Sequence, residues 1–215
     1  MIHPTAIVYP GTVIGEGTCV GPFSIIGKPY RPVADESYGS GRPAAIGHNC
    51  FIGAHVVIAQ GSQIGDECII EDGTQVEVDV SVGSHGHLLY RAQVCNEALI
   101  GEACIIGGFV CERAQVGRGC RIFGQLVHRQ LNPTAGWDEE EEEAPVIEEE
   151  AFVGFGAKVI GRVRIGRRSY VCAGAIVSKD LQENNVAYGT NRSCHFRDWK
   201  GALSRSPLFV GDENA

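Results

Sequence analysis

An aliphatic residue recurs at every sixth position over most of the 215-residue chain, and this period constrains the fold more than any other feature. The longest unbroken series has eleven members: Ile46, Ile52, Ile58, Ile64, Ile70, Val76, Val82, Leu88, Val94, Ile100 and Ile106. The same step fits the start, from Ile2 to Ile26, and the end, from Ile147 to Val177. Neither an ordinary half-buried strand nor a helix has this period. It predicts short strands joined by corners and stacked as a solenoid, with the aliphatic column inside.

Two further columns of the repeat describe the corners. The third place after the aliphatic residue holds types that tolerate a positive φ: Gly11, Gly17, Asn49, Gly61, Gly73, Gly119, Gly156 and Gly174. The fourth place is small, and it includes Cys50, Cys68, Cys104 and Cys120. We interpret these thiols as small fillers, not catalytic groups. The nine cysteines have no CxxC spacing, which fits reduced thiols better than disulfides or a zinc knuckle.

The charge and hydropathy of the chain exclude some classes of partner. A net charge of -8 argues against nucleic acid, because phosphate binding needs clustered Lys and Arg. No apolar run approaches the roughly 20 residues that a membrane span needs. The first residues have neither a basic segment nor a continuous apolar segment of the kind that signal peptides carry. We therefore expect a cytoplasmic protein with no membrane span.

The hexads resemble those of the hexapeptide-repeat acyltransferases, a family that includes galactoside, xenobiotic and sugar N-acetyltransferases. The resemblance implies an all-β fold, a left-handed parallel β-helix with one triangular coil per three hexads, or about eight coils here. We expect the β-helix over residues 1–180 and a short helical cap with a tail over 181–215. Two insertions interrupt it, 28–45 and 129–146. The first insertion is rich in Pro, Gly and Ser, which is typical of a loop.

His128 stands directly before the second insertion, where the frame of Val116 and Ile122 requires an aliphatic residue. The segment "LVHRQLNP" is similar to the histidine-plus-loop segment of xenobiotic and galactoside acetyltransferases. The resemblance implies that His128 is a general base, which takes a proton from the acceptor as it attacks an acyl thioester. Imidazole suits this role because its unperturbed pKa lies near neutrality.

Other residues near the acceptor leave alternatives open. His85 and His87 are rival sources of the base, because acyl-carrier-dependent members use a histidine on a coil without a large loop. We otherwise assign His85 and His87 to acceptor binding, together with Asn132 and Trp137 of the second insertion. The acidic run Asp138 to Glu143 is either a solvated surface or an anionic rim for an amino-bearing acceptor.

The last hexads resemble the acetyl-CoA site of the family. "VGFGAKVIG", "YVCAGAIVSKDL" and "NVAYGTNR" correspond to the stretch that lies along the groove between neighbouring subunits in those enzymes. The resemblance places Phe155 and Ala173 beside the pantetheine arm, and Ser178, Lys179 and Arg192 near the phosphates. The family's closing pattern has a proline that is missing from Gly189-Thr190-Asn191-Arg192.

The resemblance thus predicts a homotrimeric acetyl-CoA-dependent acyltransferase that acts on an amine or hydroxyl of a small sugar-like acceptor, nucleotide-linked sugars included. No metal is expected. Two other classes remain open: a non-catalytic assembly subunit, and a zinc hydratase of the gamma carbonic anhydrase kind. The hydratase needs three imidazoles around one metal, and the spacing of His85, His87 and His128 does not match that family's pattern.

Overall fold

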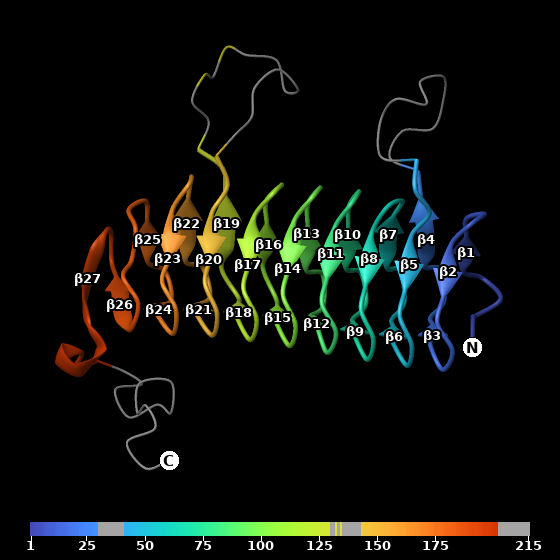
Figure 1. Ribbon diagram of the computed structural model, residues 1–215, viewed down its shortest axis with the longest axis horizontal. Coiled ribbons are helices and arrows are strands. Elements are labelled where there is room, and N and C mark those ends of the chain that lie inside the picture. The colour runs from blue at the N-terminus through green and yellow to red at the C-terminus, as the bar shows by residue number, and fades with distance from the viewer. Residues whose placement is uncertain (30–40, 130–131, 133, 135–142, 202–215) are drawn as a thin grey trace.

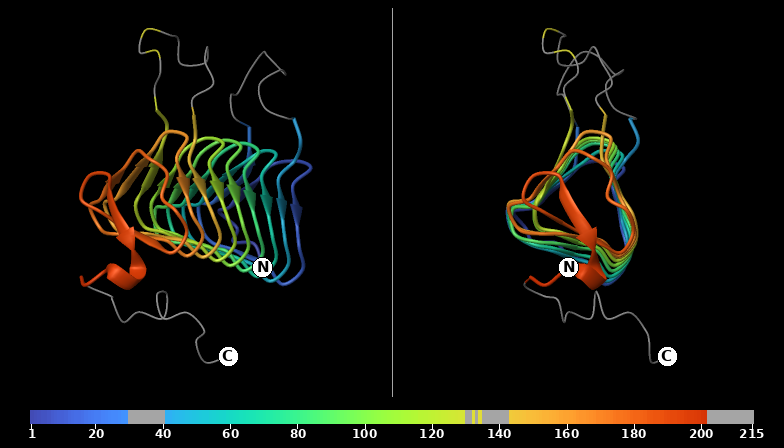
Figure 2. Two further views of the ribbon diagram at one scale, coloured as in Figure 1. Left: turned by 60° about the vertical axis from the view of Figure 1, so that its left-hand side comes forward. Right: turned by 90° about the vertical axis from the view of Figure 1, so that its left-hand side faces the viewer.

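The computed structural model describes residues 1–29, 41–129, 132, 134 and 143–201, which form a long three-sided β-helix (Figures 1 and 2). Each side is one sheet, and the sheets have nine, eight and ten strands. The chain visits the three sheets in turn, so strands that follow each other in sequence lie on different sides. The expected all-β fold is confirmed, with about nine turns consistent with a left-handed β-helix.

Most strands contain only two residues, as a six-residue period with a corner in each repeat requires. The nine-stranded sheet contains β1 (Ile7–Val8), β4 (Ile25–Lys28), β7 (Val57–Ala59), β10 (Gln75–Val76), β13 (Gln93–Val94), β16 (Phe109–Val110), β19 (Gln125–Val127), β22 (Lys158–Ile160) and β25 (Ile176–Val177). The eight-stranded sheet contains β2 (Val13–Ile14), β5 (Ala45–Ile46), β8 (Gln63–Ile64), β11 (Ser81–Val82), β14 (Leu99–Ile100), β17 (Gln115–Val116), β20 (Val146–Ile147) and β23 (Arg164–Ile165). The ten-stranded sheet contains β3 (Cys19–Val20), β6 (Phe51–Ile52), β9 (Ile69–Ile70), β12 (His87–Leu88), β15 (Ile105–Ile106), β18 (Arg121–Ile122), β21 (Phe152–Val153), β24 (Tyr170–Val171), β26 (Asn185–Tyr188) and β27 (Arg192–His195).

The aliphatic column stacks on itself through the strand register. Ile52 pairs with Ile70, which is 18 residues or one full coil further along the chain. Ile52, Ile70 and Leu88 are fully buried. Burying one such side chain contributes about 1.5–3 kcal/mol. The column is therefore the core of the protein, as its spacing predicts.

The small column supplies hydrogen bonds as well as volume. Thr18 Oγ1 donates to the carbonyl of Gly47 at 2.7 Å, and Ser169 Oγ donates to that of Gln182 at 2.7 Å. Cys50 Sγ makes the same kind of contact with the carbonyl of Gly65 at 3.2 Å. The cysteines of this column are buried free thiols. A thiol is a weak donor, so here cysteine takes the structural place of a hydroxyl.

The three edges of the prism differ in what their corners carry. The edge from the eight-stranded to the ten-stranded sheet, the glycine edge, has Gly15, Gly47, Gly65, Gly83, Gly101 and Gly117 in successive coils. A Cβ on Gly65 would lie 2.5 Å from the backbone nitrogen of Ser84, so the coils approach too closely for a side chain. The edge from the nine-stranded to the eight-stranded sheet, the loop edge, carries both insertions (Figure 1). They follow β4 and β19.

The edge from the ten-stranded to the nine-stranded sheet is the third edge. Its geometry shows that the six-residue frame expected near His128 is shifted. Its corners from Ile106 to Val110 and from Ile122 to Leu126 are steps of four residues, because a glycine in each replaces the usual turn. Leu126 is fully buried and pairs with Val110, so it occupies the aliphatic column. The prediction that His128 stands in that column is wrong. His128 lies two residues further on, at the loop edge.

The C-terminal end is closed mainly by a strand. β27 pairs antiparallel with β26, whereas the other named strand pairs of the described chain are parallel. In the described part of the expected cap, residues 181–201, the helical structure is one 3₁₀ turn, η1 (Phe196–Asp198). Phe196 and Trp199 pack against Tyr170 and Val186. No helix among the described residues has the length and apolar character to cross a membrane.

Candidate functional site

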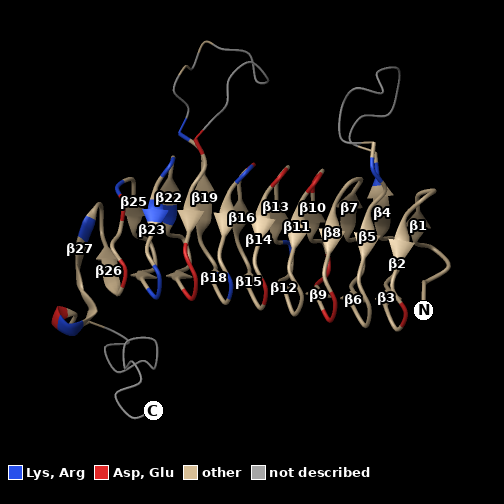
Figure 3. Ribbon diagram, viewed as in Figure 1, with Lys and Arg blue, Asp and Glu red and all other residues tan. Residues whose placement is uncertain are grey.

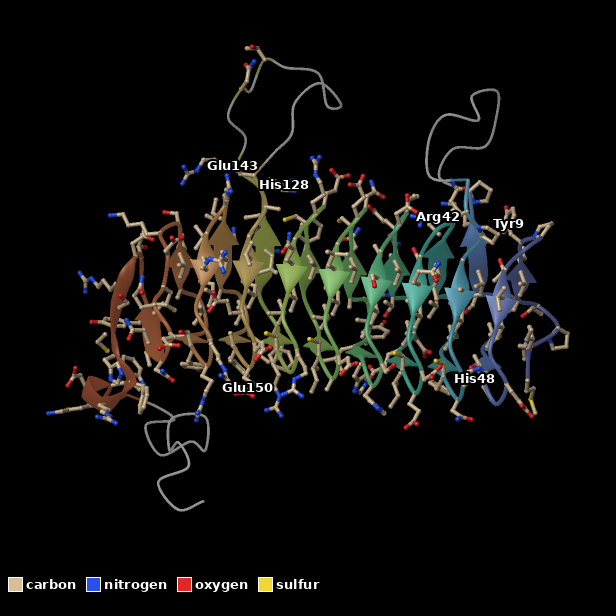
Figure 4. All side chains as sticks on the ribbon, viewed as in Figure 1. Tyr9, Arg42, His48, His128, Glu143 and Glu150 are labelled. Carbon is tan, nitrogen blue, oxygen red and sulfur yellow. The ribbon has the colours of Figure 1, made fainter. Side chains whose placement is uncertain are left out.

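His128 is half-buried where the chain leaves β19 for the second insertion (Figure 4). Its Nε2 lies 2.9 Å from the carbonyl oxygen of Glu112. A carbonyl oxygen only accepts, so Nε2 carries the hydrogen. The lone pair of the neutral imidazole is then on Nδ1. The geometry therefore assigns Nδ1 as the basic atom of this histidine.

A row of polar side chains leads along the loop edge to His128. We define this loop-edge row as Glu77, Asn96, Glu112 and His128. Asn96 Nδ2 donates to Glu112 Oε1 at 2.7 Å, and Asn96 N donates to Glu77 Oε2 at 3.3 Å. Burial, with the nearby charge of Glu112, raises the pKa of Glu77. Burial also raises the pKa of the adjacent Cys95 thiol, so that thiol is no candidate nucleophile.

The second insertion is described only at its base. Arg129 and Glu143 form an antiparallel bridge that brings the two ends of the insertion together. Asn132 Oδ1 accepts from the backbone N and Oγ1 of Thr134, at 3.1 and 2.7 Å. Trp137 and the acidic run from Asp138 to residue 142 lie outside the described residues. The assignment of Asn132 and Trp137 to the acceptor therefore stays a prediction.

Two of the predicted donor-site residues lie on the loop edge with His128. Ser178 and Lys179 follow β25, and β25 lies two strands from β19 in the nine-stranded sheet. Two coils correspond to about 10 Å along the prism. Asn191 holds Ser178 in place, since Ser178 N donates to Asn191 Oδ1 at 2.8 Å and Asn191 Nδ2 donates to Ser178 Oγ at 2.9 Å. Lys179 is exposed.

The other predicted donor-site residues are placed elsewhere. Phe155 and Ala173 lie on the third edge in successive coils, where Gly174 N donates to the carbonyl of Phe155 at 2.9 Å. Phe155 is 67% exposed and its ring stacks on Phe123 at 4.6 Å. Arg192 begins β27, opposite Tyr188. Ala173 precedes β25 and Ser178 follows it, so the two groups flank one strand of the nine-stranded sheet.

Basic residues are concentrated in the C-terminal coils (Figure 3). Nine of the 18 Lys and Arg residues lie between positions 158 and 200: Lys158, Arg162, Arg164, Arg167, Arg168, Lys179, Arg192, Arg197 and Lys200. Some of them are paired. Arg164 Nη1 lies 2.7 Å from Glu148 Oε1 and lowers the pKa of that carboxyl. The predicted donor region therefore lies at the more basic end of an acidic protein.

His85 and His87 lie apart from the loop edge. His85 has a φ of 60°, which confirms its predicted turn position, and its Nδ1 is 3.5 Å from Glu67 Oε2. His87 is on β12 in the ten-stranded sheet, and its Nε2 is 2.7 Å from Glu71 Oε1. Glu71 Oε2 accepts from the backbone N of Tyr90 at 2.9 Å. Within one chain the structure does not bring this pair to His128.

The partners of these histidines were not found by sequence reasoning. Asn96, Glu112 and His128 are spaced by 16 residues, and Glu71 and His87 are also 16 apart. The hexad period makes 18 the expected interval between neighbours. The two shortened corners are what convert it to 16 at the loop edge. The described residues contain no group of three or more His, Cys, Asp or Glu side chains placed to hold a metal ion.

Two family models match the chain. Residues 43–77 match the bacterial transferase hexapeptide model, which covers six repeats, and residues 146–179 match the hexapeptide repeat of succinyl-transferase. Among curated proteins, the bifunctional protein GlmU of Geobacillus sp. is 28% identical over 206 residues, covering 92% of this chain and 39% of the relative. GlmU of Desulfitobacterium hafniense is 23% identical over 201 residues, covering 93% and 40%. The chain thus spans about two fifths of the length of these relatives.

The solved structures that match the chain include the two described here. UDP-N-acetylglucosamine O-acyltransferase (LpxA) of Moraxella catarrhalis has a TM-score of 0.45 and 16% identity, over 89% of this chain and 75% of that one. PerB of Caulobacter crescentus, solved with CoA and GDP-perosamine, has a TM-score of 0.22 and 22% identity, over 87% and 53%. The hexads and the parallel β-helix agree with the two matched models, which show hexapeptide repeats over residues 43–77 and 146–179.

Proposed function

We propose that the protein is an acetyl-CoA-dependent acyltransferase that modifies an amine or hydroxyl of a small sugar-like acceptor, nucleotide-linked sugars included. One observation carries the proposal. His128 is half-buried at the base of an insertion, its Nε2 donates to a carbonyl, and it shares the loop edge with Ser178 and Lys179. In this proposal the general base and the phosphate end of the donor site are aligned along one edge of the prism. The matched transferase models support the reaction class.

The proposed reaction is a direct transfer within a ternary complex. Nδ1 of His128 removes the proton from the acceptor amine or hydroxyl while the acceptor atom bonds to the thioester carbonyl carbon. The tetrahedral intermediate then collapses, and the carbon–sulfur bond breaks. The CoA thiolate leaves with the electron pair and receives the proton from the His128 imidazolium. The step needs no covalent enzyme intermediate and leaves the histidine as it began.

The donor is proposed to lie over the C-terminal strands of the nine-stranded sheet. Phe155 and Ala173 would flank the pantetheine arm, and Ser178, Lys179 and Arg192 would face the phosphates. Ala173 and Ser178 stand before and after β25, at opposite edges of this side of the prism. Lys179 and Arg192 are exposed, and cations next to phosphates are favourable.

The proposed assembly is a homotrimer packed through sides of the prism. Phe51 and Ile69 are 54% and 42% exposed on the ten-stranded side, and Leu99 is 49% exposed on the eight-stranded side. Exposed apolar side chains on these two sides favour contact with another copy of the chain. A sedimentation mass equal to one chain at micromolar concentration would contradict the trimer.

The decisive experiment is a thiol-release assay with acetyl-CoA and a panel of amino sugars and nucleotide sugars. Turnover is expected with at least one acceptor, and His128→Ala is expected to lose it while still binding acetyl-CoA. Acetyl-CoA binding is measured separately by calorimetry. A wild-type protein that binds no acyl-CoA would overturn the proposal in favour of a non-catalytic assembly subunit. Stoichiometric bound zinc together with hydratase activity would overturn the proposal in favour of a zinc hydratase of the gamma carbonic anhydrase kind.

A further inference from the structure

We propose that Asn96 and Glu112 are positioning residues that hold His128 in the tautomer required of the base. The inference rests on the proposed function, because it concerns the same histidine. Asn96 fixes the corner at Glu112, and the carbonyl of Glu112 fixes the imidazole. Neither residue needs to touch the acceptor.

The three residues form one column on the loop edge. Each stands two places after a buried aliphatic residue, namely Val94, Val110 and Leu126. These aliphatic residues pair in order through β13, β16 and β19. Asn96, Glu112 and His128 therefore leave the same edge in three consecutive coils, about 4.8 Å apart.

The side chain of Asn96 uses both ends of its amide. Its Oδ1 accepts from the backbone N of Val78 at 3.1 Å, and its Nδ2 donates to Glu112 Oε1 at 2.7 Å. The backbone carbonyl of Asn96 accepts from Arg113 N at 2.9 Å. Residue 96 therefore holds the corner of Glu112 through a side-chain bond to Glu112 and a backbone bond to the next residue.

Other corners show that a structural role alone does not require an amide here. Asp66 Oδ1 accepts from the backbone N of His48, and Asp72 Oδ1 accepts from that of Ala54, both at 2.7 Å. Each carboxylate accepts a hydrogen bond from a corner backbone N, as Asn96 Oδ1 does from Val78 N. An ionised carboxylate has no hydrogen to donate onward. Asparagine at position 96 adds a donor, and that donor is directed at Glu112.

The fixed corner at Glu112 orients the imidazole of His128 through the backbone carbonyl of Glu112. The carboxylate of Glu112 is held by Asn96, and the next residue, Arg113, is fixed at a φ of 56°. The carbonyl of Glu112 is then directed at His128 Nε2. This contact favours the tautomer with the hydrogen on Nε2 and the lone pair on Nδ1.

The test combines a spectroscopic readout with kinetics. Side-chain ¹⁵N NMR of His128 is expected to show the Nε2–H tautomer in the wild type and a mixture of tautomers in Asn96→Ala. The kcat of Asn96→Ala is expected to fall about 10- to 100-fold, as misplacement of a catalytic group does, with the KM for acetyl-CoA unchanged. Asn96→Asp is nearly isosteric and should behave alike, because it places a second carboxylate against Glu112. Glu112→Gln keeps an acceptor for Asn96 and should retain the tautomer.

Asp66→Ala is the matched control, since it removes an equivalent corner bond on the glycine edge. It should leave the His128 spectrum and kcat unchanged. If both Asn96 variants fold, keep the Nε2–H tautomer and stay within about threefold of wild-type kcat, below the general-base range, the inference fails while the proposed function stands. If His128→Ala itself keeps turnover, both fail. Asn96→Asp keeps the test valid if the alanine variant does not fold.

Discussion

His128 on the loop edge and His87 on the ten-stranded side have similar local chemistry in different surroundings. Each donates from Nε2, His128 to the carbonyl of Glu112 and His87 to the carboxylate of Glu71. His87 pairs in register with Ile69 and Ile105 on an unbroken side of the prism. His128 stands where the coil opens into an insertion, at the end of the loop-edge row. An oriented imidazole is thus not enough to mark a site, and the break in the repeat is what distinguishes the two.

The largest effect should come from exchanging the two histidines for amides. His128→Asn is expected to lower kcat by about 10²- to 10⁴-fold, the usual contribution of a general base, because an amide accepts no proton near neutral pH. His87→Asn should leave kcat within a few-fold of wild type. Steady-state thiol release measures both.

The reverse result would break the comparison. Loss of turnover in His87→Asn with an active His128→Asn would assign the base to the His87–Glu71 pair. Glu71→Gln would then lower kcat as well, because it removes the carboxylate that holds His87. Sedimentation of each variant checks that the assembly is intact.

The next effect concerns how strictly the regular coils are packed. Gly65→Val is expected to destabilise the fold by about 3 kcal/mol, because its Cβ would meet the backbone of Ser84. Gly119→Ala, in the turn position of the same edge, meets only Glu150 Cγ at 3.5 Å and should cost about 1 kcal/mol. Urea denaturation compares the two. Equal losses would contradict the close approach of coils at the glycine edge.

A smaller effect tests whether the loop edge also serves the donor. Lys179→Ala should raise the KM for acetyl-CoA about tenfold with kcat nearly unchanged, because a cation at the phosphates contributes equally in ground and transition states. Lys200→Ala, an exposed lysine beyond η1, is the control. A fall in kcat without a change in KM would remove Lys179 from the donor site.

The smallest effect is a pH dependence at the start of the loop-edge row. Burial raises the pKa of Glu77, so the folded protein holds this proton more tightly than the unfolded chain does. The stability from the protonated carboxyl is present below the unfolded pKa and is lost as pH rises through the folded pKa. Glu77→Gln removes this loss. The free energy of unfolding of the variant should therefore rise relative to that of the wild type from about pH 4, near the usual carboxyl pKa, to about pH 7. Urea denaturation at both pH values measures it, and an equal difference at the two would contradict it.

The sequence predicts the fold well because one physical requirement repeats in every coil. Ile52 and Ile70 are buried where the period places them, and Cys50 lies in the small column beside hydroxyl residues. The position of His128 was missed for a local reason. In "IFGQLV" the corner takes four residues, so the buried residue after Ile122 is Leu126. Counting six residues from Ile122 leads instead to His128.

The candidate site depends on that register, so less of it follows from sequence. Asn96 and Glu112 become neighbours of His128 only after both short corners are counted. The contact of Asn191 with Ser178 is a tertiary hydrogen bond that spacing does not reveal. The general base, the donor site and the trimer remain predictions for the experiments above.

The two insertions leave the same edge after β4 and β19, which are five strands apart in one sheet. Five coils correspond to about 24 Å. Each coil adds a fixed rise and returns the chain to the same edge. The separation between the two points is therefore a whole number of coil rises. Duplication or loss of 18 residues between the insertions would move one relative to the other by about 4.8 Å without turning it to another side. The spacing between the points where the two insertions begin can therefore change in whole coils, while the surroundings of His128 stay as they are.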